Sequence, residues 1–113
     1  MEFDEHLISA ARLSIVAALI SGETLSFMQL KRVTKLADGN LHVQCRKLAD
    51  VDYIEIRKGL KGRRSYTSFR LTERVIAAMK LHVRKLNSIL AMESGEISLN
   101  PGAGRDDDAQ VWS

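Results

Sequence analysis

The stretch that decides the fold runs from Asp38 to Leu71 and reads DGNLHVQCRKLAD (38–50), VDYIEIR (51–57), KGLKGRRS (58–65) and YTSFRL (66–71). Its first part places Leu41, Cys45 and Leu48 at i, i+4 and i+7, which is the spacing of a helix with one buried stripe. Asp38 stands where such a helix needs an N-cap. We therefore predict a helix that begins at Asp38 and turns a polar face outward.

The second part of this stretch predicts a β-hairpin. Residues 53–57 and 65–71 alternate apolar and polar side chains as strands do, and a turn from Gly59 to Gly62 joins them. Residues 57–70 carry six Lys or Arg side chains and no carboxylate. Solubility alone usually mixes charges of both signs, so this basic run indicates a surface that attracts phosphate groups.

Three further helices are predicted around the hairpin. Apolar residues at helical spacing predict a first helix from Asp4 to about residue 21. A second helix, about 27–34, follows a capping box of Ser26 and Gln29, and residues 23–25 have room for a short edge strand. The last helix begins at Thr72 and continues to about residue 92. Its apolar positions step by three and four, as in helices that pack along another helix: Ile76, Met79, Val83, Leu86 and Leu90.

Length and composition restrict the class of protein. A chain of 113 residues with 45% hydrophobic content fits one domain. Its single cysteine excludes an internal disulfide and any site that needs two thiolates. The longest apolar run is too short to span a bilayer and the N-terminus is acidic, unlike a signal peptide, so we expect a cytoplasmic protein.

Charge divides the chain into two parts. Residues 93–113 hold five carboxylates and one Arg, which gives them a net charge of −4. Because the formal net charge of the whole chain is +3, residues 1–92 carry a net charge of +7. We expect 1–92 to form the folded domain, with a dimerisation helix at about 72–92, and 93–113 to be a disordered acidic tail.

Several short segments resemble the landmarks of small prokaryotic winged helix-turn-helix transcriptional regulators, related to the MarR-like and ArsR-like families: RLSIVAAL (12–19), SFMQL (26–30), DGNL (38–41), RKL (46–48), YI (53–54) and RLTE (70–73). The resemblance covers roughly residues 10–90. It implies a mainly α fold with a two- or three-stranded β-wing and a long C-terminal dimerisation helix. It also implies a homodimer on duplex DNA, with the third helix in the major groove and the wing on the backbone or minor groove.

Two positions depart from the pattern of these regulators. Asp52 stands where they usually have Gly between the third helix and the wing, and Val75 stands where Gly often follows the Leu-Thr-Glu-x segment. Asp tolerates a left-handed backbone, and Val75 lengthens the apolar face of the last helix. Neither departure disturbs the predicted fold.

The predicted DNA-binding side chains lie on three elements. Asn, Gln and Arg side chains read the edges of adenine or guanine, and Val43 is suited to a thymine methyl group. On the recognition helix they are Asn40, His42, Val43, Gln44, Arg46 and Lys47. On the wing they are Lys58, Lys61, Arg63, Arg64 and Tyr66, and on the second helix, against the DNA backbone, Lys31, Arg32 and Lys35. The alternative for each group is an ordinary solvated surface.

The predicted function is sequence-specific binding of double-stranded DNA by a homodimeric transcriptional regulator, a repressor by occlusion. The alternative is a winged-helix protein-interaction module that binds an acidic partner. No cofactor, metal or catalytic residue is predicted, since His6, His42 and His82 lie on separate elements and Cys45 is core filler rather than a redox switch. An effector is left open, and it would have to sit at the dimer interface.

Overall fold

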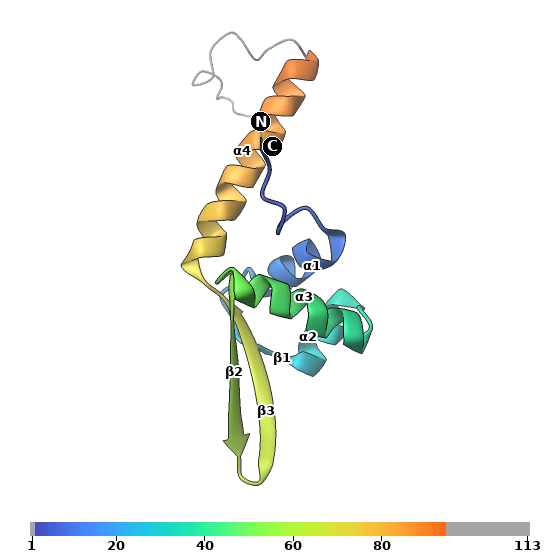
Figure 1. The fold of residues 1–113 in the computed structure, drawn as a ribbon, viewed down its shortest axis with the longest axis vertical. Helices are drawn as coiled ribbons and strands as arrows, with labels where there is room; N and C mark the ends of the chain where they lie inside the picture. The colour runs from blue at the N-terminus through green and yellow to red at the C-terminus, as the bar shows by residue number, and fades with distance from the viewer. Residues whose placement is uncertain (1, 95–113) are drawn as a thin grey trace.

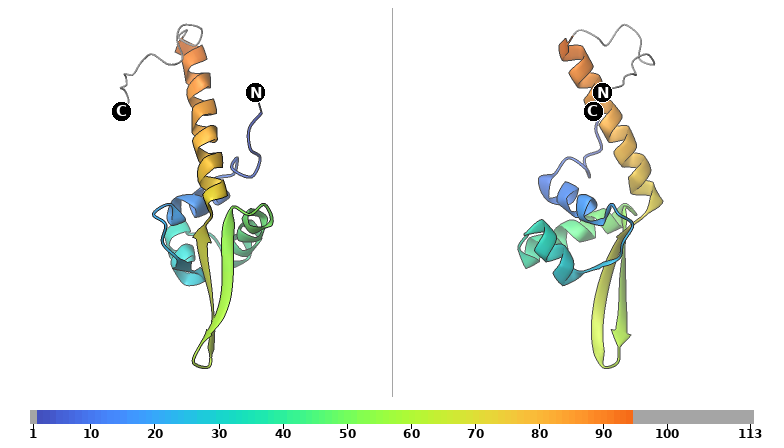
Figure 2. Two further views of the ribbon diagram at one scale, coloured as in Figure 1. Left: turned by 90° about the vertical axis from the view of Figure 1, so that its left-hand side faces the viewer. Right: turned by 180° about the vertical axis from the view of Figure 1, so that it is seen from behind.

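The computed structural model describes residues 2–94 as a helical part from which a hairpin and a long helix extend (Figure 1). The elements in chain order are α1 (Ala10–Leu19), β1 (Leu25–Ser26), α2 (Phe27–Thr34), α3 (Asp38–Asp50), β2 (Ile54–Lys61), β3 (Arg64–Leu71) and α4 (Glu73–Ser94). The β2–β3 hairpin and α4 leave the helical part in opposite directions in every view (Figures 1 and 2). This is the predicted winged helix-turn-helix arrangement.

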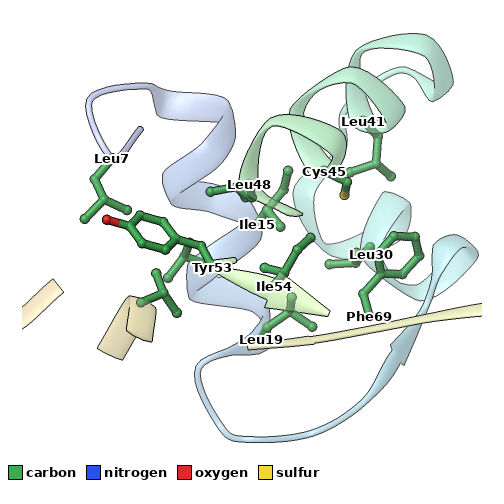
Figure 3. Close-up of a cluster of buried hydrophobic side chains, with 12 residues drawn as sticks. Leu7, Ile15, Leu19, Leu30, Leu41, Cys45, Leu48, Tyr53, Ile54 and Phe69 are labelled. Carbon is green, nitrogen blue, oxygen red and sulfur yellow. The ribbon is translucent and has the colours of Figure 1, made fainter. Parts of the chain in front are cut away.

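One hydrophobic core joins the three short helices to the base of the sheet (Figure 3). The predicted stripe of Leu41, Cys45 and Leu48 is confirmed, because all three side chains are buried. They pack with side chains from the N-terminal segment, α1, α2, the hairpin and its start, and the first turn of α4: Leu7, Ile15, Val16, Leu19, Leu30, Tyr53, Ile54, Phe69 and Val75. Burial of a Leu or Ile side chain contributes on the order of 1.5–3 kcal/mol, so this core fixes α3 against α1 and α2.

The first helix is shorter than predicted, because Asp4 caps a separate turn and Ser9 is the N-cap of α1. Asp4 closes a separate turn, in which the His6 N–H donates to Asp4 Oδ1 and the Leu7 N–H to the Asp4 carbonyl, both at 2.9 Å. Ser9 then caps α1 by accepting from the Arg12 N–H at 3.2 Å. The predicted start of this helix at Asp4 was therefore wrong, whereas the helix ends before Gly22 as predicted.

The second helix matches its prediction, whereas the cap of the third does not. The capping box of Ser26 and Gln29 is present, and β1 forms the edge strand of the sheet. Ala37 occupies the N-cap position of α3 without a side-chain cap. Asp38 lies inside the first turn, where its carboxylate is 2.6 Å from Lys31 Nζ. Its negative charge also interacts favourably with the positive end of the helix dipole.

The sheet has three antiparallel strands in the order β1-β3-β2, so β3 lies between the other two. The predicted turn from Gly59 to Gly62 is narrower in the structure. Lys61 pairs with Arg64, which leaves a two-residue turn of Gly62 and Arg63 with Gly62 at a φ of 67°. Glycine adopts this positive φ without strain, and Gly59 instead lies within β2.

The last helix begins at the predicted residue and extends two residues past the predicted end. Thr72 Oγ1 accepts from the Val75 N–H at 3.4 Å and donates to the Asp52 carbonyl at 2.7 Å. Asp52 has the left-handed φ of 64° expected of a residue that replaces Gly, and Val75 is fully buried. No helix within residues 2–94 is long and apolar enough to cross a membrane. The tail predicted for 93–113 lies outside the described residues from 95 onward.

Candidate nucleic-acid interface

The helix-turn-helix is made by α2 and α3, and the outer face of α3 is solvent-exposed. Lys35 ends α2 in the left-handed conformation, with a φ of 61°, and this turns the chain toward α3. Burial of the stripe on the inner side leaves Val43 half exposed and Arg46 and Lys47 exposed on the outer side. These three predicted side chains form a surface that a groove of DNA can meet.

His42 is exposed but not free to rotate into a groove. Its ring stacks on Phe27 of α2, with centroids 4.3 Å apart and planes 20° from parallel. Phe27 in turn lies against Phe69 of β3, with ring centroids 6.3 Å apart. The predicted role of His42 as a base reader is therefore less direct, since its ring also holds α2 against α3.

Gln44 is turned toward α1 rather than outward. Arg12 Nη1 donates to Gln44 Oε1 at 2.7 Å, and Gln44 Nε2 donates to Asn40 Oδ1 at 3.0 Å. Asn40 itself is exposed. Gln44 is thus half-buried in a contact within the protomer, whereas Asn40, which accepts its hydrogen bond, is exposed.

Arg12 is a residue of this site that the sequence prediction missed. It lies 32 positions before Gln44, and helical periodicity within α3 gives no sign of a partner on α1. A single basic residue beside the apolar stripe of residues 4–21 was the one available signal, and a solvated Arg explains it equally well. Only the packing of α1 on α3 brings the two side chains together.

The basic side chains of the wing lie on strands as well as in a loop. Antiparallel pairing puts Arg57, Lys61, Arg64 and Arg70 on one face of the hairpin with Tyr66, whereas Lys58 lies on the other face. Arg63 lies in the turn. The predicted strands, 53–57 and 65–71, place the four predicted wing cations between them in a connecting loop, and of the four only Arg63 lies in the turn.

A carboxylate outside the basic run contacts its inner end. Glu55 lies opposite Arg70 across the ladder, with Oε1 3.1 Å from Arg70 Nε, and the same oxygen is 3.6 Å from Arg57 Nε. Lys58, Lys61, Arg63 and Arg64 form no ion pair with a carboxylate in residues 2–94. These four side chains, which we call the wing tip, carry the uncompensated positive charge.

Tyr66 is packed against the hairpin rather than extended from it. A Cβ atom built on Gly59 would be 2.8 Å from Tyr66 Oη and 2.9 Å from its Cζ atom. The Tyr66 ring therefore occupies the space that any larger residue at position 59 would need. Tyr66 remains about half exposed, so its hydroxyl can still donate to a phosphate.

Of the three cations predicted on the second helix, two are unpaired in the described part of the chain. Lys31 is engaged with Asp38, whereas Arg32 and Lys35 are exposed and form no ion pair there.

Cys45 is buried, which raises the pKa of its thiol to about 11 and leaves it protonated at neutral pH. Residues 2–94 bring together no group of three or more His, Cys, Asp or Glu side chains that could hold a metal ion.

The predicted dimer residues on α4 divide into two sets. Ile76 and Met79 are half-buried, and Met79 packs against the core of its own protomer. Val83, Leu86 and Leu90 are exposed, with exposed fractions of 44–65%. Among residues 2–94 the protomer therefore buries α4 as far as His82 and leaves these three side chains exposed.

Beside this stripe lies a groove of about 480 Å³ between α4 and the N-terminal segment. Its lining is almost wholly apolar and includes Phe3, Leu13, Leu86 and Ile89. His82 also lines it, with 8% exposure, a ring contact to Phe3 at 6.0 Å and no hydrogen-bond partner for Nδ1 among the described residues.

The chain resembles known regulators in sequence and in fold. A transcriptional regulator homologue from Pyrococcus horikoshii OT3 has a TM-score of 0.62 at 26% identity, over 81% of this chain and 88% of that one. BpsR of Bordetella bronchiseptica, whose DNA binding is regulated by 6-hydroxynicotinic acid, has a TM-score of 0.61 at 14% identity, over 91% of this chain and 71% of that one, and at this identity shows the fold alone. No curated protein sequence matches the chain. The family model of the winged helix DNA-binding domain matches residues 11–90, so this chain belongs to that family.

Proposed function

We propose that this protein is a sequence-specific regulator of transcription that binds duplex DNA as a homodimer and represses by occlusion. The observation that carries the proposal is the position of two exposed surfaces on one frame. The outer face of α3 and the carboxylate-free wing tip are both joined to the same core, α3 through its buried stripe and the hairpin through Ile54 and Phe69. One surface has the size and side chains to read a groove, and the other has the charge to hold phosphates.

In this proposal α3 enters the major groove and the wing follows the backbone or the adjacent minor groove. An α-helix with its side chains is about 10–12 Å wide, which fits a major groove about 12 Å wide. Arg46 is suited to donate to guanine, and Val43 to touch a thymine methyl group. Arg32 and Lys35 lie at the α2–α3 turn and contribute phosphate contacts.

The homodimer is supported by the uncovered part of α4. A helix of 22 residues is about 33 Å long, and the core of one protomer reaches only its first turns. Contiguous exposed apolar residues of this kind mark protein–protein interfaces. Pairing through Val83, Leu86 and Leu90 relates the two copies of α3 by a two-fold axis, so the operator should be an inverted repeat with half-sites about 34 Å apart.

Selection from a pool of random duplex DNA tests this function against binding of an acidic protein. We expect a shared inverted-repeat motif to be enriched over the input pool. If the bound DNA has the composition of the input, and a polyanion such as heparin or poly-glutamate competes as well as any duplex, the chain is an acid-binding interaction module instead.

We also infer that the groove beside His82 is a place for an effector. Its walls are almost wholly apolar and include the ring of His82, which suits a small aromatic molecule. A panel of aromatic acids and phenols, read by thermal shift, should contain a compound that stabilises the wild type and not His82→Phe. Equal shifts in both proteins would place the ligand elsewhere.

A further inference from the structure

Three side chains from α1 and α3 form a hydrogen-bond relay with one possible direction. An Arg guanidinium has only donors, so the Gln44 atom 2.7 Å from Arg12 Nη1 has to be the oxygen. The Gln44 amide group then faces Asn40 with its nitrogen, and the atom it meets at 3.0 Å has to be Asn40 Oδ1. The orientation of both amides therefore follows from the chemistry of Arg12.

The start of this relay is fixed in place. Arg12 Nε donates to the His6 carbonyl at 2.8 Å and Nη2 donates to the Glu5 carbonyl at 3.0 Å, so three nitrogens of one guanidinium are engaged. The turn that supplies these carbonyls is anchored by Leu7, which is fully buried, and by the hydrogen bond from Tyr53 to Asp4. Reversal of the relay would require this turn to move.

We propose that Arg12 is a positioning residue that presents Asn40 to DNA as a hydrogen-bond donor, so that α3 selects guanine where Asn40 reaches the major groove. The proposal rests on the function proposed above and names one base that the same site reads. A free Asn side chain pairs with adenine, since it donates to N7 and accepts from the N6 amino group. Guanine has two acceptors in the major groove, N7 and O6, and no donor.

The relay discriminates between these two bases because it engages one of the two lone pairs of Asn40 Oδ1 and so holds the amide in one orientation. An amide that turns Oδ1 toward adenine N6 leaves that orientation and loses the bond from Gln44 Nε2. Gln44 is half-buried between α1 and α3, its bond to Asn40 lies at the exposed side of that contact, and Nε2 has no other hydrogen-bond partner within residues 2–94. Donation from Asn40 Nδ2 to guanine leaves the whole relay intact.

Binding selection on random duplex DNA with matched variants tests this assignment. Asn40→Ala identifies the base position that Asn40 reads, because the preference there disappears. Wild type should favour guanine over adenine at that position by about twofold, the size expected of one exposed side-chain bond between residues a helical turn apart. Gln44→Met keeps the size of the side chain without its amide, and the guanine-to-adenine ratio should fall to about one or below.

A second variant and a control separate the relay from packing. Gln44→Glu still accepts from Arg12 but has no donor for Asn40, so it should shift the ratio as Gln44→Met does even if the methionine variant folds poorly. Ser14→Ala, on α1 but outside the relay, should leave the ratio unchanged. Circular dichroism melts check that each variant is folded.

Three results would overturn the inference. One is a wild-type preference for adenine at this position, another is an unchanged ratio in both Gln44 variants, and the third is a motif that Asn40→Ala leaves intact. In all three the chain still enriches a motif, so its function as a sequence-specific binder stands. A pool without any enriched motif would overturn that function and this inference together.

Discussion

The wing tip and the distal half of α4 extend from the same core in opposite directions, and they differ in the chemistry they leave exposed (Figure 1). The wing tip exposes Lys58, Lys61, Arg63 and Arg64 without a carboxylate partner in residues 2–94. Distal α4 exposes apolar side chains along one stripe, with Val83, Leu86 and Leu90 at its centre. Neither surface is needed to complete the fold of one protomer.

The difference indicates two kinds of partner. Exposed cations gain by releasing the counterions of a polyanion, a gain that salt reduces. Exposed apolar side chains gain by leaving water, which depends little on salt. The two ends should therefore respond differently in experiments that vary salt or introduce charge.

The largest expected effect is from a charge in the apolar stripe. In Val83→Glu each protomer would bury an unpaired carboxylate against the other, so dimers should dissociate at micromolar concentration. Loss of the second half-site contact should weaken binding to an inverted repeat by about 10²–10⁴-fold. Sedimentation velocity measures the first effect, and fluorescence anisotropy on a selected duplex measures the second.

Leu81→Glu is the matched control for that change. Leu81 has 45% exposure against 47% for Val83, but it lies on the opposite side of the helix, two residues away. It should remain dimeric. A Val83→Glu protein that still dimerises, or a wild type that is monomeric at tens of micromolar, would assign the stripe to a partner other than a second copy.

At the other end of the molecule, removal of charge from the wing tip should reduce the salt dependence of binding. For about 6–10 phosphate contacts the affinity falls on the order of 10³–10⁵-fold between 50 and 200 mM salt. The double variant with Arg63→Ala and Arg64→Ala removes up to four phosphate contacts from a dimer. The fold loss of affinity between 50 and 200 mM salt should therefore be about a hundred times smaller than in the wild type. All duplexes should weaken alike, because phosphate contacts carry no sequence information.

The control for the wing is Arg70→Ala, since Arg70 is paired with Glu55 at 3.1 Å. Its effect on the salt slope should be clearly smaller than that of the wing-tip variant. Equal slopes for the two proteins would mean that the hairpin binds along its whole length, and that the distinction between its tip and its base has no functional meaning.

A third change distinguishes the face of α3 from the wing. Arg46→Ala should cost roughly 1–3 kcal/mol on the selected sequence for each lost base contact, with little loss on random DNA. Comparison of both duplexes by competition anisotropy gives this difference directly. An equal loss on the two duplexes would mean that Arg46 holds phosphate, as the wing does.

The elements of the fold were predictable because they depend on local periodicity. The stripe of Leu41, Cys45 and Leu48, the capping box at Ser26 and the hairpin all follow from spacings of a few residues, and all are present. The boundaries failed where two signals competed. Asp4 and Ser9 both cap, and Gly59 and Gly62 both permit a turn, so only packing selects between the members of each pair.

The candidate site was predictable as a surface but not as a set of contacts. Exposure of Asn40, Val43, Arg46 and Lys47 follows from helical geometry, as predicted. The engagement of Gln44 with Arg12 does not, because it joins residues 32 positions apart through the packing of two helices. Glu55 likewise precedes the basic run in sequence but faces Arg70 only across the paired strands.

The smallest expected effect concerns the N-terminal segment, which joins the helical part to α4. The Tyr53 hydroxyl donates to Asp4 Oδ2, and Tyr53→Phe should reduce the free energy of unfolding by about 1 kcal/mol.

The same hydrogen bond affects the pKa of Asp4. Burial alone would raise this pKa, but the hydrogen bonds from Tyr53 and the His6 N–H, together with the charge of His6, outweigh burial and lower the pKa from 3.8. This stabilisation is present above pH 3.8 and is lost as the pH falls through the lower pKa of the folded protein. In urea titrations the free energy of unfolding of the wild type should therefore fall in that acid range. The fall should be smaller for Tyr53→Phe, because the pKa of its Asp4 is less depressed. Tyr66→Phe, the other tyrosine, should match the wild type in both respects, and a Tyr53→Phe protein with wild-type stability and acid sensitivity would show that this hydrogen bond does not hold the segment.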